Sequence, residues 1–317
     1  MQYGQTLQAV LAYIDANITE ELSMALIAEK AGYSAYHFGR VFTESIGVSP
    51  MSYVTWRKLQ FALHDLSRGR KVIDVASEYG FETHAGFTKA FVRQYGFPPS
   101  LCYTRINAEP PAPVSADILK IQFTGGNTLQ PHIMEVTPFA VAGYSNRHQA
   151  PHMRTTGDAP TFWNTLNLDY GPLLSKLYDT FPLSKHCEIS MCYDVDEASG
   201  EFSYMLGRGI DNPADLANIQ PDMTRVDITG GLYAIFSTPP VADSYIQTVQ
   251  DAWNEIFLRW LPQSEFEYDA ARHDFEYHDK RDHGEYFGGK LQIDIYVPIK
   301  QRQAEAQKAR LREGRKG

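Results

Sequence analysis

The chain has 317 residues, of which 43% are hydrophobic, 21% charged and 13% aromatic, and its formal net charge at pH 7 is -9. This composition excludes the disordered and collagen-like classes, and no stretch approaches the roughly 18 apolar residues of a membrane span. Because one domain usually holds about 100–200 residues, the length favours two domains. The N-terminus lacks a basic segment followed by an apolar one, so we expect a cytoplasmic protein rather than a secreted one. Cys102, Cys187 and Cys192 lack metal-ligand spacing and are expected to be reduced thiols.

The charge is unevenly distributed along the chain. Residues 1–107 carry 10 Lys and Arg against 9 Asp and Glu, and residues 300–317 carry 7 against 2. The stretch 108–299 holds the other 12 basic and 27 acidic residues, which gives it a net charge of -15. The change coincides with prolines at 110, 111 and 113, which cannot continue a helix. The sequence therefore predicts one domain at 1–106, a linker at 107–118, a second domain at 119–300 and a basic tail at 301–317. The alternative interpretation is a surface loop within a single domain.

An internal repeat occupies the first hundred residues. Each copy predicts a short helix, a glycine that ends it, and a second helix with two phenylalanines four residues apart on its buried side. The helices are expected at 22–31 and 35–45 in the first copy and at 72–79 and 83–95 in the second. A longer helix at 50–66, roughly 25 Å in length, joins the copies. The repeated residues are Ala28, Gly32, Tyr33, Ser34, Phe38, Arg40, Phe42, Gly47 and Pro50, matched by Ala76, Gly80, Phe81, Thr83, Phe87, Lys89, Phe91, Gly96 and Pro99.

Each copy has the pattern of a helix-turn-helix motif, whose second helix enters the major groove of DNA. The joining helix is about as long as the separation of two successive major grooves. Arg40 can donate a fork of hydrogen bonds to guanine O6 and N7. The alternative is a helical interaction domain with exposed charges, which the near-neutral charge of residues 1–107 leaves open.

Residues 4–103 resemble the DNA-binding domain of the AraC/XylS family of transcriptional regulators, in the group that places this domain first. The resemblance is carried by IDVA at 73–76, GF at 80–81, FTKAF at 87–91 and GFPP at 96–99, and by GVSP at 47–50 with Tyr53 and Arg57. It implies an all-α domain of two helix-turn-helix units. Ala85 and Gly86 depart from the polar residues usual there, so we expect the second unit to recognise DNA shape and phosphate more than bases.

The side chains expected at DNA follow from the helix faces and from the matching family positions. In the first unit they are Tyr36, Gly39, Arg40 and Thr43, and in the second Thr83, His84, Ala85, Thr88 and Lys89. Arg57, Lys58, Arg93 and Arg105 are candidate phosphate contacts.

The acidic half predicts an α+β domain in which the order β-α-β-β occurs twice and the helices lie on one side of a sheet. Strands are expected at 133–144, 188–195, 201–210, 224–237, 274–279 and 291–299, and amphipathic helices at 158–181 and 243–261.

This half resembles the gyrase-inhibitor-like (GyrI-like) effector-binding domain. The matching pieces are PFAVAG at 138–143, GGLYAIF at 230–236, WLP at 260–262, FEY at 275–277 and IYVPI at 295–299. The resemblance implies a pocket between the two β-α-β-β halves for a small, often cationic and aromatic ligand, with Glu276 as its glutamate. A ligand cation would supply the charge that a buried carboxylate needs. The candidate walls are Trp163, Tyr193, Tyr204 and Tyr296, which could equally be ordinary core aromatics.

The sequence therefore predicts a transcriptional regulator that is not an enzyme, binds promoter DNA and a small-molecule effector, works with RNA polymerase, and needs no membrane, cofactor or metal. His273, His278 and His283 recur every five residues, a spacing that does not place three metal ligands on one face, so we expect them to be solvated. No nucleophile elbow, P-loop or dinucleotide fingerprint occurs. Two alternatives stay open: a hydrolase that uses Glu276, and an acidic domain that docks a protein partner or mimics DNA.

Overall fold

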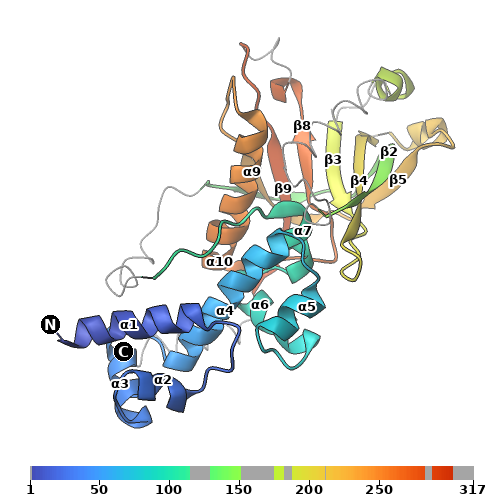
Figure 1. Cartoon of the computed structure of the whole chain (residues 1–317). Coiled ribbons are helices and arrows are strands. Elements are labelled where there is room, and N and C mark those ends of the chain that lie inside the picture. Colours follow the sequence, from blue (N-terminus) through green and yellow to red (C-terminus); the bar gives the residue numbers. More distant parts are fainter. Residues whose placement is uncertain are drawn as a thin grey trace.

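A computed structural model describes residues 2–114, 129–150, 175–181, 188–210, 212–282 and 288–302. Helices make up the first part of the chain, and an antiparallel sheet flanked by α9 makes up the second (Figure 1). No helix within these ranges is long and apolar enough to cross a membrane. The predictions for Trp163, Cys187 and His283, and for the tail beyond residue 302, lie outside the described residues.

The helical part has the two predicted units and the predicted connecting helix, together with a first helix that the repeat did not indicate. Each predicted boundary lies within two residues of the observed one, because caps and glycines define most of them. The helices are α1 (Gln2–Ala16), α2 (Met24–Lys30), α3 (Ala35–Ile46), α4 (Pro50–Ser67), α5 (Val72–Glu78), α6 (His84–Tyr95), the short η1 (Pro99–Leu101) and α7 (Cys102–Arg105).

The two units share their local geometry down to individual hydrogen bonds. Ser34 caps α3 by accepting from the His37 amide, and Thr83 caps α6 by accepting from the Gly86 amide. Both helices end at a glycine with positive φ, Gly47 at 89° and Gly96 at 85°. The predicted duplication is therefore a duplication of structure.

The sheet is antiparallel throughout its described pairs, and its strand order is β1-β6-β9-β8-β3-β4-β2-β5, with β7 pairing β9. Strands β6, β9 and β8 mirror β2, β4 and β3 across the β8–β3 pair, so the predicted β-α-β-β duplication is present. The strands are β1 (His132–Val136), β2 (Phe139–Gln149), β3 (Glu188–Tyr193), β4 (Glu201–Ile210), β5 (Thr224–Ile228), β6 (Gly231–Ser237), β7 (Phe266–Tyr268), β8 (Phe275–His278) and β9 (Asp294–Gln301).

Two of the predicted strands are each divided in two. The stretch 133–144 is interrupted at residues 137 and 138, where Pro138 has no amide hydrogen to donate to a ladder. The stretch 224–237 is interrupted at residues 229 and 230, and Gly230 has a φ of 70°. A side chain at Gly230 would place its Cβ 2.6 Å from the carbonyl oxygen of Val136, so the close approach of these two breaks requires glycine.

One face of the sheet carries the helices. Phe236 and Ile295 pack in the same buried cluster as Trp253 and Phe257 from the helical stretch α9 (Tyr245–Glu255), η4 (Ile256–Trp260) and α10 (Leu261–Gln263). A helical segment at 175–180 contributes Leu177 to a second cluster. The turn η4 is a π-helix just before Pro262, whose ring would clash with a regular helix and whose missing amide needs no partner. The opposite face holds a third buried cluster around Met191, Met205 and Tyr233.

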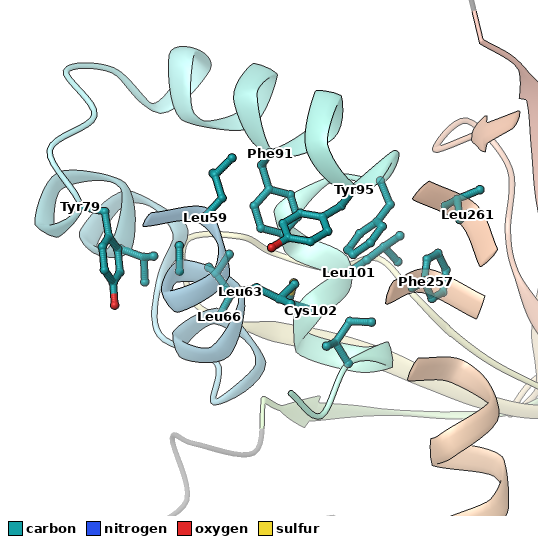
Figure 2. Close-up of a cluster of buried hydrophobic side chains, with 14 of the residues drawn as sticks. Leu59, Leu63, Leu66, Tyr79, Phe91, Tyr95, Leu101, Cys102, Phe257 and Leu261 are labelled. Atoms are coloured by element: carbon teal, nitrogen blue, oxygen red, sulfur yellow. The ribbon is translucent and has the colours of Figure 1, made fainter. Parts of the chain in front are cut away.

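The two parts of the chain share one hydrophobic core. Figure 2 shows Phe257 and Leu261 lying beside Tyr95 and Leu101 of the helical part. The rings of Phe97 and Phe257 meet edge to face with centroids 5.0 Å apart. The Tyr268 amide also donates to the carbonyl of Gly96 at 2.9 Å. The end of α6 is therefore anchored directly on the sheet-bearing part.

Candidate DNA-binding face and effector site

The residues expected at DNA in the first unit lie on the outer side of α3. Tyr36 is 84% exposed, and the Arg40 side chain is 68% exposed and hydrogen-bonded to Glu44 through Nε at 2.9 Å. Thr43 is exposed and donates to the carbonyl of Gly39 at 2.7 Å. Gly39 itself is half-buried, and a Cβ there would lie 3.1 Å from Cε of Met24, so this glycine lets α2 and α3 pack closely.

In the second unit, most of the expected residues are also exposed. Ala85, Lys89 and Arg93 lie on the surface. Thr83 is exposed as well, and its hydroxyl caps α6 by accepting from the Gly86 amide. His84 lies 3.4 Å from a carboxylate oxygen of Glu197, which belongs to the connection between β3 and β4. Thr88 is half-buried, and its hydroxyl has no hydrogen-bond partner among the described residues.

Two of the arginines expected at phosphate are buried instead. The Arg57 side chain is 2% exposed and forms two hydrogen bonds of 2.7 Å to Asp15, so it joins α4 to α1. It also donates to Gln60 at 2.6 Å and to the carbonyl of Ala112 at 3.2 Å. The Arg105 side chain is likewise 2% exposed and pairs with Asp274. The sequence-based assignment of these two residues to phosphate is therefore wrong, because neither guanidinium reaches the surface.

Glu276 lies at the middle of the sheet, on the strand pair that joins its two halves. It occupies β8, where it is opposite Ser190 on β3 and Ile295 on β9. Its side chain points to the helix-bearing face, while Phe275 and Tyr277 pack in the cluster on the other face, as the alternation of the strand predicts. Glu276 is 3% exposed, so its carboxylate is almost fully removed from solvent.

The Glu276 carboxylate accepts two hydrogen bonds from uncharged donors. Trp253 Nε1 donates to Oε1 at 2.7 Å, and the hydroxyl of Ser190 donates to Oε2 at 2.8 Å. The bond from the indole is short for an N–H donor, and the bond from the hydroxyl has the usual length for an O–H donor. The carboxylate is therefore satisfied by the protein itself, from α9 on one side and from β3 on the other.

His278 completes this network. Its Nε2 lies 3.0 Å from the Ser190 hydroxyl and 3.8 Å from Glu276 Oε2, and its Nδ1 lies 2.7 Å from Asp282. Burial opposes protonation, but the Asp282 hydrogen bond and the charges of Asp282, Glu276 and Glu188 outweigh it, so the pKa of His278 is raised. The Ser190 hydroxyl donates its hydrogen bond to Glu276, so its oxygen can act only as an acceptor toward His278. A protonated Nε2 of His278 is the donor that fits this oxygen. His278 is thus not a solvated histidine.

The expected aromatic walls are divided between the two faces. Tyr204 is buried with Cys192 on the side of Glu276. Tyr193 and Tyr296 pack with the cluster on the other face, so their expected place beside Glu276 is wrong. Each stands one position out of register with the strand residues that face the helices, and a shift of one residue reverses the direction of a side chain.

Residues that the sequence did not indicate surround Glu276 instead. Tyr245, at the start of α9, is half-buried, and its removal from solvent together with Asp282 raises its pKa. Trp253 lies within the amphipathic helix expected at 243–261, where periodicity marks it only as an apolar residue, and its indole N–H donates to Glu276. Beyond His278, Tyr178 donates to Glu188, and the guanidinium of Arg208 lies 4.1 Å from the Tyr178 ring.

No group of three or more potential metal ligands is present among the described residues. The site around Glu276 consists of a buried carboxylate, aromatic rings and a histidine. Such an arrangement suits an organic cation, which pairs with the carboxylate and lies against aromatic faces.

Comparison with known proteins identifies both parts. Residues 132–299 match the family described as integron-associated effector binding protein, which is more than half of the chain. The chain belongs to this effector-binding family. Residues 27–102 match the family described as helix-turn-helix domain, and the relatives of this part are AraC-type transcriptional regulators.

Among those relatives, the transcriptional activator AarP of Providencia stuartii is 34% identical over 93 residues, which cover 29% of this chain and 69% of AarP. The multiple antibiotic resistance protein MarA of Salmonella typhimurium is 30% identical over 95 residues, covering 30% and 75%. The right origin-binding protein of Escherichia coli is 29% identical over 102 residues, covering 32% and 35%. The chain thus spans only about a third of the right origin-binding protein, and 34% of the regulator YbfP of Bacillus subtilis.

Two solved structures resemble the effector-binding domain. SAV2435, in a complex with tetraphenylphosphonium, is 16% identical with a TM-score of 0.39, covering 54% of this chain and 94% of that protein. The integron cassette protein VCH_CASS2 from Vibrio cholerae is 21% identical with a TM-score of 0.35, covering 55% and 100%.

Proposed function

We propose that the chain is a transcriptional regulator whose α3 and α6 enter two successive major grooves of promoter DNA and whose effector-binding domain binds a small aromatic cation at Glu276. In this proposal the protein acts in the cytoplasm, on promoters that RNA polymerase transcribes. The observation that carries the proposal is that one chain contains both a duplicated helix-turn-helix domain and a domain with a buried carboxylate next to aromatic side chains.

The DNA part is supported by the equivalence of α3 and α6. Both are 12-residue helices with the same caps, and their outer sides carry Tyr36, Arg40, Lys89 and Arg93. Helix α4, at 18 residues, is roughly 27 Å long, and so supplies most of the roughly 34 Å that separates successive major grooves. We assign base contacts to Tyr36 and Arg40 and phosphate contacts to Lys89 and Arg93.

The effector part is supported by the chemistry around Glu276. A buried carboxylate that keeps its charge attracts a cation strongly, because little water screens it. Tyr204 lies on the same face of the sheet, and the Trp253 ring adjoins the carboxylate. An aromatic cation can exchange its hydration for these contacts, each ring face contributing about 0.5–2 kcal/mol.

A hydrolase would need a nucleophile or base free to act on the ligand. Ser190, His278 and Asp282 follow one another at hydrogen-bond distance in the order of a nucleophile, a base and an orienting carboxylate. The Ser190 proton, however, is directed at Glu276 and not at the histidine, and Ser190 is 2% exposed. We therefore expect no protein-dependent release of p-nitrophenol from p-nitrophenyl acetate, and a release abolished by Glu276→Gln would establish the hydrolase.

Calorimetric titration with tetraphenylphosphonium, a permanent cation with four phenyl rings, tests the effector site. Glu276→Gln should weaken binding about tenfold or more, since the pairing charge is lost. The matched control is Glu135→Gln, which removes the same charge from an exposed position on β1 and should leave binding within about twofold. Equal loss in both variants would show that the acidic surface as a whole binds the cation. Unchanged binding by Glu276→Gln would contradict the site.

A further inference from the structure

We propose that Arg105 and Trp253 transmit occupancy of the Glu276 site to the second helix-turn-helix unit. The inference rests on the proposed function, in which Glu276 holds the effector. It assigns to these two residues the coupling between the effector and the DNA-binding domain.

Arg105 is a cation of the helical part that is buried inside the sheet-bearing part. It ends α7, and its guanidinium donates through Nε and Nη2 to the two oxygens of Asp274, both at 3.0 Å. Asp274 stands two residues before Glu276. This two-bond geometry fixes the plane of the guanidinium as well as its position.

Trp253 connects that cation to the effector carboxylate. The Arg105 guanidinium lies 4.5 Å from the centroid of the Trp253 ring. The same indole donates its N–H to Glu276 Oε1 at 2.7 Å. One side chain therefore contacts the arginine with its face and the effector site with its edge. Any rotation of the indole changes both contacts together.

Helix α7 is in turn fixed to the second helix-turn-helix unit. The hydroxyl of Tyr103 accepts from the Val72 amide, the first residue of α5, at 3.0 Å and donates to the Arg70 carbonyl at 3.2 Å. Cys102 and Tyr103 are buried in the core that also contains Phe91 of α6. A displacement of Arg105 therefore reaches α5 and α6 through packed side chains and hydrogen bonds.

A cation at Glu276 competes with the indole for the carboxylate oxygen. Oε1 accepts from Trp253 in the structure, and with a cation bound it faces the ligand. The indole then takes a second orientation, and the Arg105 guanidinium loses its ring contact. The ligand thus interacts differently with two arrangements of α7, which is the condition for coupling between distant sites.

Hydrogen exchange of the full-length protein tests this route. Peptides that cover residues 97–106 are compared with and without saturating tetraphenylphosphonium, in the wild type and in Trp253→Phe, which keeps a ring but removes the N–H donor. We expect the ligand to change exchange in the wild type by about fivefold or more and in Trp253→Phe by less than about twofold. Calorimetry measures the affinity of Trp253→Phe for the cation, so that hydrogen exchange in each protein is compared at a cation concentration that saturates it.

Asn254→Ala is the matched control, because Asn254 is the next residue of α9 and also joins the two parts of the chain. Its side chain forms two hydrogen bonds of 3.1 Å with the backbone of Asn107. We expect the ligand response of Asn254→Ala to equal that of the wild type. A full response in Trp253→Phe, or an equal loss in both variants, would overturn the inference while leaving the effector site intact.

A second measurement does not depend on the ligand. Glu276→Leu removes the acceptor of the indole, so it should change exchange of residues 97–106 in the wild-type background and have no such effect in Trp253→Phe. Additive effects of the two substitutions would overturn the route. Failure of tetraphenylphosphonium to bind the wild type, by contrast, would count against the proposed function alone.

Discussion

The Glu276 carboxylate is held by protein donors before any ligand arrives. An unpaired carboxylate in this position would cost several kcal/mol, and Trp253, Ser190 and the nearby His278 remove that cost. A cation bound at Glu276 as proposed would therefore replace existing partners instead of filling an unsatisfied site. Its net binding free energy is the difference between the free energy of its own contacts and that of the contacts that it displaces.

His278 makes this residue cluster sensitive to pH. Its pKa in the folded protein is raised above the unfolded value, so it stabilises the fold fully below about pH 6.5, and this contribution is lost as the pH rises through the folded pKa. We expect the melting temperature of the wild type to exceed that of His278→Gln most at about pH 5.5 and to approach it as the pH rises. Thermal melts of both proteins over this range measure the difference.

His273 supplies a control with the opposite sign. Burial lowers its pKa against the influence of Asp274, so protonation of this residue destabilises the fold as the pH falls. His273→Gln should therefore gain stability relative to the wild type on acidification. A wild-type advantage over His278→Gln that grows with rising pH would contradict the assigned charge of His278.

On the DNA face, Arg40→Ala should lose specific binding more than non-specific binding. A fork to guanine contributes about 1–3 kcal/mol of discrimination, so the ratio of the two affinities at fixed salt should fall by about 5–150-fold. Arg68→Ala, which removes an exposed arginine at the end of α4, is the control. A loss of the same size on every DNA sequence would make Arg40 a phosphate contact.

Individual residues of the site could be predicted only where the pattern of a strand settled their direction. The alternation of FEY at 275–277 placed Glu276 on one face and its two aromatic neighbours on the other, and this is confirmed. The partners could not be predicted, since Ser190 and Trp253 are 86 and 23 residues away in sequence. Hydrophobic periodicity marks Trp253 as a core residue and says nothing about its N–H.

At the scale of elements, α1 and α4 are held together by an ion pair between Asp15 and Arg57. The sequence alone assigned Arg57 to a DNA phosphate. The pair of Arg57 with Asp15 is buried at the arginine end, and it also fastens the Pro-rich segment through the carbonyl of Ala112. Since the resemblance at residues 47–57 places Arg57 among DNA-binding motifs, only the packed structure could reveal its partners. The guanidinium lies 5.1 Å from the Phe61 ring as well.

Arg57→Ala should therefore destabilise the protein. Removing one partner of a buried pair costs about 3–5 kcal/mol, because Asp15 is left without its cation. Urea denaturation measures the loss, and Arg93→Ala, an exposed arginine on α6, should change the free energy of unfolding by no more than about 0.5 kcal/mol. A stable Arg57→Ala that is defective only in DNA binding would restore the phosphate role.

The helices of the repeat and the helix that joins them were predictable from this sequence to within two residues, whereas α1 was not indicated and two predicted strands are each divided in two. Caps and terminal glycines mark where α3 and α6 begin and end, so local residues define these boundaries. The breaks at Pro138 and Gly230 lie inside continuous hydrophobic stretches and arise where the two segments approach each other. The two segments approach each other only in the folded sheet, so the alternation of apolar and polar residues along the chain does not predict these breaks.

At the scale of the whole molecule, the two parts are one packed body, and their charges differ. The near-neutral helical part lies against a domain that carries most of the acidic residues. Phe97, Phe257 and Leu261 are buried where the two parts pack together. The acidic Glu197 meets His84 at the start of α6. The two parts therefore share a packed interface, so a change in the structure of one is expected to affect the other.

The central claim is that a cation at Glu276 controls binding of DNA by the same chain. The direct measurement is the dissociation constant of the full-length protein for DNA selected by it from a random pool, at fixed salt, with and without saturating tetraphenylphosphonium. We predict a change of about fivefold or more in the wild type, an equal reciprocal change in the affinity for the cation, and none in Glu276→Gln. A wild-type protein that binds both ligands, with neither affecting the other, would contradict the account.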